Sequence, residues 1–153
     1  MRLTDFISPE AVVANLKATN KKQLLQELSE RAAKLSGLSA REIFDALLHR
    51  ERLGSTGIGE GIAIPHGKLS TLDRVYGVFA RLAAPVEFEA VDGQPVDLVF
   101  ALLAPDHAGA DHLKALARIS RLLRDRQMRE KLRGSETREA LYALLVEQQA
   151  SAA

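Results

Sequence analysis

Histidine is the side chain whose neutral ring nitrogen can act as a nucleophile near neutral pH, and this chain has four histidines. His66 has the most unusual neighbours, because it stands between Pro65 and Gly67. Proline fixes its own φ and pushes the preceding residue towards extended backbone, while glycine leaves space beside the ring. The pattern indicates a histidine on a stiff, open backbone, which suits a functional histidine. The residues alone leave open the alternative of an ordinary turn histidine.

A second candidate histidine, His112, is predicted to lie at the start of a helix. Leu116 and Ile119 follow it by four and seven positions, so His112 shares their inward-facing stripe. Taken alone, the position favours a half-buried histidine bonded to a backbone carbonyl. The alternative is a second imidazole that points at the same site as His66. The other two histidines are predicted to be exposed: His49 and His107.

Groups suited to binding an anion precede His66 in the sequence. Arg50 and Arg52 stand just before a glycine-rich segment that contains Ser55 and Thr56. Arginine forks match phosphate oxygens, and glycine-flanked amides and hydroxyls can surround an anion. The alternative for the two arginines is that they are solvated cations that complement a helix dipole, and for each one alone this alternative is favoured.

Two other kinds of chemistry fit the residues poorly. The glycine-rich segment 54–59 lacks the lysine and the following helix of a nucleotide-binding P-loop. A metal site needs closely spaced ligands, and the only cluster of histidines and carboxylates lies in the predicted loop 106–112. We therefore expect no metal and no other cofactor. The absence of cysteine excludes disulfides and thiolate zinc sites.

The composition is that of a globular protein, with 46% hydrophobic and 27% charged residues in a chain of 153. We expect one domain over 1–150 and a frayed C-terminus at 151–153. The absence of a signal peptide or apolar span predicts a cytoplasmic protein without membrane insertion. The net charge of +1 gives no overall attraction to nucleic acid, although segment 114–138 is strongly basic. A solvated helix face is favoured there over a nucleic-acid-binding module, which stays the alternative from another class.

Hydrophobic periodicity predicts alternating strands and helices. Leu113, Leu116, Ala117 and Leu123 are expected to face inward from the helix that follows residue 111. The natural packing is an α/β fold with a mixed sheet covered by helices. The expected strands are 12–16, 75–83 and 96–104, and the expected helices are 21–36, 40–53, one from about 111, 126–133, and one capped by Ser135.

The segment from Arg50 to Lys68 resembles the signature of the IIA components of the bacterial phosphotransferase system, in the fructose, mannitol and nitrogen-regulatory branch. The N-terminal residues 4–7 and the helix around 111–113 also fit, so the resemblance covers nearly the whole chain. It implies a mannitol-specific-IIA-like single domain with helices on both faces of the sheet. The match from Arg50 to Lys68 is a contiguous and highly specific block, which includes Gly54-Ser55-Thr56-Gly57 and Ile64-Pro65-His66-Gly67.

The resemblance also implies a role for each candidate residue. His66 would accept a phosphoryl group on its tele nitrogen from an HPr-like carrier protein of the NPr type. Arg50 matches the family's active-site arginine, and His112 matches its second active-site histidine. Ser55 and Thr56 fall in the matching loop, where we expect them to bind phosphate. Neither a metal nor a nucleotide is required for this half-reaction.

Two branches of the family differ in what the phosphoryl group is for. The stand-alone length and the segment 54–57 favour the nitrogen-regulatory type, in which phosphorylation controls partner proteins such as potassium-transport regulators. The alternative is a sugar-specific IIA component that passes the phosphoryl group to a IIB protein for fructose or mannitol uptake.

Overall fold

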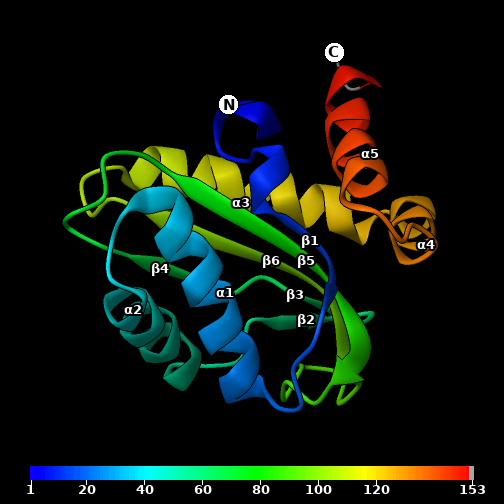
Figure 1. The fold of residues 1–153 in the computed structure, drawn as a ribbon, viewed down its shortest axis with the longest axis horizontal. Coiled ribbons are helices and arrows are strands. Elements are labelled where there is room, and N and C mark those ends of the chain that lie inside the picture. The colour runs from blue at the N-terminus through cyan, green and yellow to red at the C-terminus, as the bar shows by residue number, and fades with distance from the viewer. Residues whose placement is uncertain (152–153) are drawn as a thin grey trace.

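A six-stranded mixed sheet forms the centre of the computed structural model, which describes residues 1–151 and side chains up to residue 147 (Figure 1). The two long central strands, β5 (Tyr76–Val86) and β6 (Val96–Ala104), are antiparallel. β1 (Val12–Leu16) lies parallel to β5 at one edge. The other side of β6 pairs in succession with two short parallel strands, β3 (Ile62–Ala63) and β4 (His66–Lys68). β2 (Gly57–Gly59) completes the sheet beside β3.

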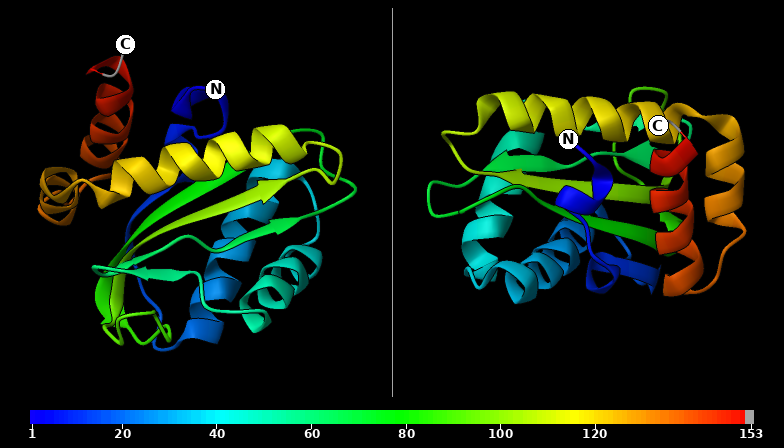
Figure 2. Two further views of the ribbon diagram at one scale, coloured as in Figure 1. Left: turned by 180° about the vertical axis from the view of Figure 1, so that it is seen from behind. Right: turned by 90° about the horizontal axis from the view of Figure 1, so that it is seen from above.

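Helices cover both faces of this sheet, as predicted (Figure 2). α1 (Lys21–Ser36) and α2 (Ala40–Arg52) pack on one face, and α3 (Gly109–Arg124) crosses the other. α4 (Arg126–Arg133) and α5 (Arg138–Ser151) follow α3 at one end of the molecule. Two short 3-10 helices precede β1: Leu3–Asp5 and Pro9–Ala11.

Side-chain alternation along the central strands produces two apolar layers. In β5, Phe79 faces the layer under α3, whereas Val78 faces the layer under α1 and α2. In β6, Phe100 and Ala101 divide in the same way. Because successive strand residues point to opposite faces, a continuous apolar run of this kind predicts a strand buried on both sides. All four of these side chains are 3% exposed or less, so the two central strands form a rigid support.

The start and end of α1 lie where the sequence predicts them. Asn20 Oδ1 accepts a hydrogen bond from the amide of Gln23 at 2.8 Å, which satisfies one of the free N–H groups of the first turn. Gly37 ends the helix in the left-handed region at φ 78°. Ser39 accepts from two amides of the first turn of α2 in the same manner.

The orientation of α3 differs from the predicted one. The buried stripe runs through His112, Ala115 and Ile119, whereas Leu113 is 70% exposed and Ala117 is also exposed. With 3.6 residues per turn, a helix that buries position 112 carries positions 113 and 117 away from that stripe. The prediction that Leu113 and Ala117 face inward was therefore wrong. The prediction that His112 shares the buried stripe is confirmed.

The final helix begins later than the sequence suggests. Ser135 does not cap it, because its hydroxyl donates instead to the carbonyl of Lys131 at 2.8 Å, at the end of α4. Thr137 is the capping residue, and its hydroxyl oxygen accepts from the amide of Ala140 at 3.1 Å. Ser151 is the last residue of α5, and the rest of the predicted frayed end, 152–153, lies outside the described residues. The proposed domain bounds of 1–150 stay a prediction.

Candidate active site

His66 lies on a strand rather than in a turn, so its backbone is held on one side by the sheet. β4 runs parallel to β6, with His66 opposite Leu102, and the carbonyl of Pro65 accepts from the Leu102 amide at 2.9 Å. The neighbouring Gly67 is required by a close approach of α2: a Cβ there would meet the backbone of Ala46 at 3.2 Å. Its φ is not positive. The short segment therefore packs Gly67 against α2 and leaves the imidazole of His66 half-buried.

The His66 ring is fixed in a defined orientation and tautomer. Its Nδ1 lies 2.9 Å from the carbonyl oxygen of Ile64, two residues earlier in the chain. A carbonyl oxygen can only accept, so Nδ1 carries the proton and donates. In the neutral ring, Nε2 then holds the free lone pair. The nitrogen available for nucleophilic chemistry is therefore Nε2, which is the tele nitrogen.

A second imidazole, that of His112, lies beside His66. The ring centroids are 5.6 Å apart and the planes meet at 71°, an edge-to-face arrangement. His112 is 5% exposed, and its Nε2 is buried without a hydrogen-bond partner among the described residues. Buried polar atoms are rarely left unpaired, so this nitrogen is available to a group that enters the site. The two histidines, 46 positions apart in sequence, are brought together because β4 and the start of α3 meet at one end of the sheet.

Arg50 reaches the same site from the last turn of α2. Its Nη1 donates to the carbonyl of Gly54 at 2.8 Å, which holds the guanidinium beside the end of its own helix. With His66 and His112 it lines a cavity of about 520 Å³. The cavity is lined by five polar or charged side chains (His49, Arg50, His66, Lys68 and His112) together with apolar residues that include Leu53, Leu113 and Leu116.

Both site histidines are biased towards the neutral form. Burial is the main cause that lowers the pKa of His66, and the Arg50 charge lowers it further, against the raising effects of the Ile64 carbonyl and of Glu51. Burial, with smaller contributions from His66 and Lys68, lowers the pKa of His112 to about 4. At neutral pH the site therefore contains two uncharged imidazoles next to a permanently charged guanidinium, an arrangement that combines a nucleophile with an anion-binding group.

The structure does not bring Ser55 and Thr56 into the cavity. Ser55 Oγ donates to the carbonyl of Phe88 at 3.0 Å and accepts from the Gly57 amide. Thr56 is 4% exposed, and its hydroxyl donates to a carboxylate oxygen of Glu51. Among the described residues, neither contributes to the cavity lining. Their phosphate-binding role stays a prediction, and their observed partners lie inside the protein.

Sequence reasoning missed several residues at or near the site. His49 was predicted to be exposed and Leu113 to face the core, yet both line the cavity. Glu51 was not singled out, because a carboxylate between two arginines near a helix end is ordinarily solvated; here it is 6% exposed. The available signal was the helical position: Glu51 is four residues after the buried Leu47, so both occupy the buried face of α2.

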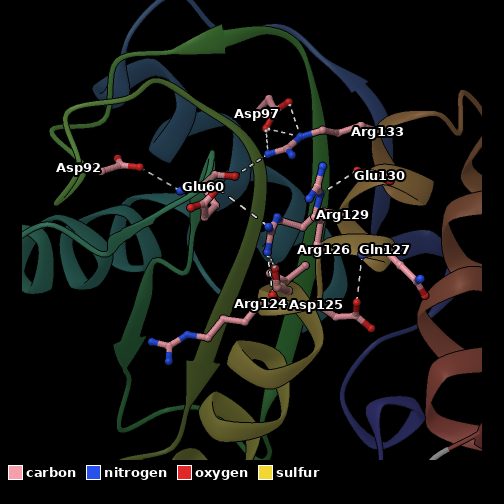
Figure 3. Close-up of polar contacts among 11 residues, drawn as sticks. Glu60, Asp92, Asp97, Arg124, Asp125, Arg126, Gln127, Arg129, Glu130 and Arg133 are labelled. Atoms are coloured by element: carbon pink, nitrogen blue, oxygen red, sulfur yellow. Dashed lines mark hydrogen bonds and ion pairs between the residues drawn. The ribbon is translucent and has the colours of Figure 1, made fainter.

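Part of the basic segment 114–138 is paired within the molecule (Figure 3). Arg133 forms a two-pronged contact with Asp97, with Nε to Oδ2 at 2.9 Å and Nη2 to Oδ1 at 3.0 Å. Arg133 Nη2 also donates to the carbonyl of Glu60 at 2.6 Å. Arg129 Nη1 donates to the carbonyl of Arg124 at 2.8 Å and is largely buried. Arg133 therefore joins α4 to β6 and to the turn between β2 and β3, and Arg129 joins α4 to the end of α3. Neither cation is free to meet phosphates.

The part of the chain that the structure describes contains no group of three or more histidine, cysteine or carboxylate side chains placed to hold a metal ion. Within the same residues, no helix is both long enough and apolar enough to span a bilayer.

Comparison with known proteins agrees with this fold. Residues 5–148 match the family model described as phosphoenolpyruvate-dependent sugar phosphotransferase system, EIIA 2. A nitrogen regulatory protein of Bradyrhizobium diazoefficiens is 56% identical over 153 residues, the full length of both chains. The crystal structure of nitrogen regulatory protein IIA-Ntr from Neisseria meningitidis has a TM-score of 0.88 and 35% identity, over 92% of this chain and 97% of that chain. IIA mannitol from Escherichia coli, at 23% identity, shares the fold, with a TM-score of 0.77 over 91% of this chain and 98% of that one.

The shared architecture defines a single-domain α/β protein of the IIA type, which confirms the predicted fold class. The chain belongs to the EIIA 2 family of the phosphoenolpyruvate-dependent sugar phosphotransferase system and resembles its nitrogen-regulatory members. It is a IIA protein and hence a component of a phosphotransferase system.

Proposed function

We propose that this protein is a phosphohistidine carrier that accepts a phosphoryl group on Nε2 of His66. The observation that carries the proposal is the pairing of His66 Nδ1 with the Ile64 carbonyl at 2.9 Å, which leaves Nε2 as the nucleophile beside Arg50 and His112. The donor is a carrier protein of the HPr class, in its NPr-type form, that bears its own phosphohistidine.

The transfer is a direct exchange between two imidazoles. The Nε2 lone pair of His66 attacks the phosphorus in line, and the new N–P bond forms as the donor's N–P bond breaks. The electron pair of the broken bond returns to the donor's ring nitrogen. The Nδ1 proton of His66 stays on its ring, where the Ile64 carbonyl stabilises the positive charge that develops. The transferred group is metaphosphate-like, so the protein mainly positions and neutralises it.

Arg50 and His112 supply that neutralisation. The Arg50 guanidinium lines the cavity and is charged at every physiological pH, so it opposes the negative charge on the equatorial oxygens. His112 Nε2, unpaired among the described residues, donates a hydrogen bond to one of those oxygens when it carries the proton. Because such donors are already in place before the reaction, they stabilise the transition state without reorganisation.

Phosphorylation then changes what the surrounding surface can bind. A phosphoryl group adds roughly two negative charges at the mouth of the cavity, beside the cationic Arg50 and Lys68. A relative that matches over the full length carries the name nitrogen regulatory protein, and we assign this chain the same kind of role. Target proteins, such as regulators of potassium transport, would bind one of the two charge states in preference to the other.

The test is reconstitution with enzyme I, an NPr-type HPr protein and labelled phosphoenolpyruvate. We expect one acid-labile, base-stable phosphoryl group per chain in the wild type and none in His66→Ala. His49→Ala is the matched control, because His49 lines the same cavity and is expected to leave the labelled residue unchanged. Full labelling of His66→Ala would contradict the proposal. Rapid onward transfer to an added sugar-specific IIB protein would favour the alternative role in sugar uptake.

A further inference from the structure

A buried carboxylate, that of Glu51, lies in the last turn of α2 next to the candidate active site. Glu51 is 6% exposed and directly follows Arg50 in the chain. It is not among the residues that line the cavity, so it does not touch a phosphoryl group bound there. A charge in such a position is costly unless it is paired and hydrogen-bonded, and its retention therefore requires an explanation from its contacts.

Glu51 is held by two residues from other parts of the chain. Its Oε1 accepts from the Thr56 amide at 3.1 Å, and its Oε2 accepts from the Thr56 hydroxyl. The Nζ of Lys21, the first residue of α1, lies 3.0 Å from Oε1. Lys21 Nζ also lies 4.5 Å above the Phe88 ring, which keeps this cation in place. The carboxylate therefore joins the ends of α1, α2 and the segment before β2.

One continuous path of hydrogen bonds leads from Glu51 to His66. Thr56, which Glu51 holds through two bonds, accepts with its own carbonyl from the Ile64 amide at 3.0 Å. The Ile64 carbonyl in turn accepts from His66 Nδ1 at 2.9 Å. Each bond fixes the residue that makes the next one. The position of the His66 ring is therefore tied to the position of the Glu51 carboxylate.

A second path leads from Glu51 to Arg50. The bonds between Glu51 and Thr56 close a short loop, and Gly54 lies within it. The Gly54 amide donates to the Glu51 carbonyl at 3.1 Å, and the Gly54 carbonyl accepts from Arg50 Nη1 at 2.8 Å. A change in the shape of this loop would therefore move the acceptor that holds the guanidinium.

We propose that Glu51 is a positioning residue for phosphoryl transfer, which sets the separation between the Arg50 guanidinium and Nε2 of His66 through Thr56. Lys21 balances the charge of the carboxylate. This inference rests on the proposed function, and it gives Thr56 a role away from the phosphate. Transfer chemistry is sensitive to such placement, because a displacement of about 1 Å can cost about 100-fold in rate.

Two substitutions at Thr56 separate positioning from simple stability. Thr56→Ser keeps the hydroxyl that donates to Glu51, whereas Thr56→Val keeps the shape and removes the donor. We expect Thr56→Val to lower kcat for phosphoryl acceptance by about 10- to 100-fold with KM for the donor little changed, and Thr56→Ser to restore most of the rate. Equal kcat for the two variants and the wild type, all shown to be folded by thermal melts, would overturn the proposal.

A third substitution, Glu51→Gln, tests the carboxylate itself without using phosphate. The matched control is Glu42→Gln, at an exposed carboxylate in the first turn of the same helix. In ¹⁵N NMR of unphosphorylated protein we expect Glu51→Gln to weaken the Nδ1–H preference of His66 and to lower its pKa, since Glu51 raises that pKa. Glu42→Gln should change neither. An unchanged His66 tautomer and pKa in Glu51→Gln would contradict the inference. An unlabelled wild type in the reconstitution would instead contradict the proposed function.

Discussion

The rings of His66 and His112 meet edge to face, with their centroids 5.6 Å apart, although His66 belongs to the short strand β4 and His112 lies near the start of α3. Nδ1 of His66 is committed to a backbone carbonyl, while Nε2 of His112 is buried without a partner in the described part of the chain. One ring is thus prepared as a nucleophile, and the other offers a polar atom to whatever binds next to it.

Replacing His112 by alanine should slow phosphorylation without changing the labelled residue. The variant loses a preorganised hydrogen-bond donor to the transferring group, and the loss of one such donor typically costs about 100-fold or more in rate. Rapid-quench measurement of labelled protein, with the NPr-type donor at saturating concentration, gives the rate. An unchanged rate would remove His112 from the reaction.

The stability of the folded protein should fall as the pH drops below neutral, and His112 should contribute to the fall. Its pKa in the folded state is about 4, below the value of 6.5 that a histidine has in the unfolded chain. The unfolded state therefore binds the proton first, and stability declines as pH falls from about 7 towards 4. Between about pH 7.5 and pH 5 the expected loss is about 2 kcal/mol.

Urea unfolding of the wild type and of His112→Gln at both pH values measures this contribution. The variant cannot take up the proton at position 112, so its decline should be smaller by about 2 kcal/mol. The lowered pKa of His66 adds a loss of the same sign in both proteins. Identical declines in the two proteins would show that His112 has an ordinary pKa.

Two exposed leucines at the cavity should contribute to donor binding. Leu53 is 74% exposed and Leu113 is 70% exposed, and both line the cavity. Exposed apolar side chains at a docking site gain by leaving water, so Leu53→Ser with Leu113→Ser should raise KM for the donor protein by about tenfold and leave kcat near the wild-type value. Val91→Ser is the control, because Val91 is 76% exposed and does not line the cavity. Equal KM values in all three proteins would exclude this contact.

The substitution Gly67→Ala should destabilise the fold. The added methyl group would lie 3.2 Å from backbone atoms of Ala46, so β4 and α2 would have to separate. Overpacking of this kind costs about 1–3 kcal/mol. Thermal or urea unfolding measures the loss, with Gly109→Ala as the control, because a Cβ at Gly109 would meet no described atom within 4 Å. A loss no larger than in Gly109→Ala would show that the contact is easily relieved.

Regular hydrophobic periodicity made most helices and long strands predictable from the sequence. Elements that depend on pairing with distant parts of the chain were not predictable. β6 occupies the predicted residues because eight of its nine positions, all except Asp97, are apolar, and an apolar run of this length is typical of a buried strand. The short strands β2, β3 and β4 were not predicted, since two- and three-residue strands are defined by their partners rather than by their own pattern. The cap at Thr137 was missed because Ser135 has the same local chemistry, and only the end of α4 decides between them.

In the site, too, the residues identified by their sequence neighbours were predictable, whereas those defined by contacts with other elements were not. His66 was recognisable from Pro65 and Gly67, but the residues alone did not connect it with His112; the family resemblance made that connection. Glu51 was missed because its partners Lys21 and Thr56 are supplied by other elements. The Thr56 hydroxyl was expected to bind phosphate because it lies in a glycine-rich loop. The composition of that loop did not indicate that the hydroxyl would donate to the buried carboxylate of Glu51.

The most direct test of this account identifies the phosphorylated atom. The protein, labelled with ¹⁵N in its histidines, is phosphorylated with enzyme I, the NPr-type carrier and phosphoenolpyruvate and observed by ³¹P and ¹⁵N NMR at about pH 8. We expect one phosphoryl group, coupled to Nε2 of His66, with Nδ1 still donating to the Ile64 carbonyl. A phosphoryl group on Nδ1 of His66, or on any other residue, would contradict it.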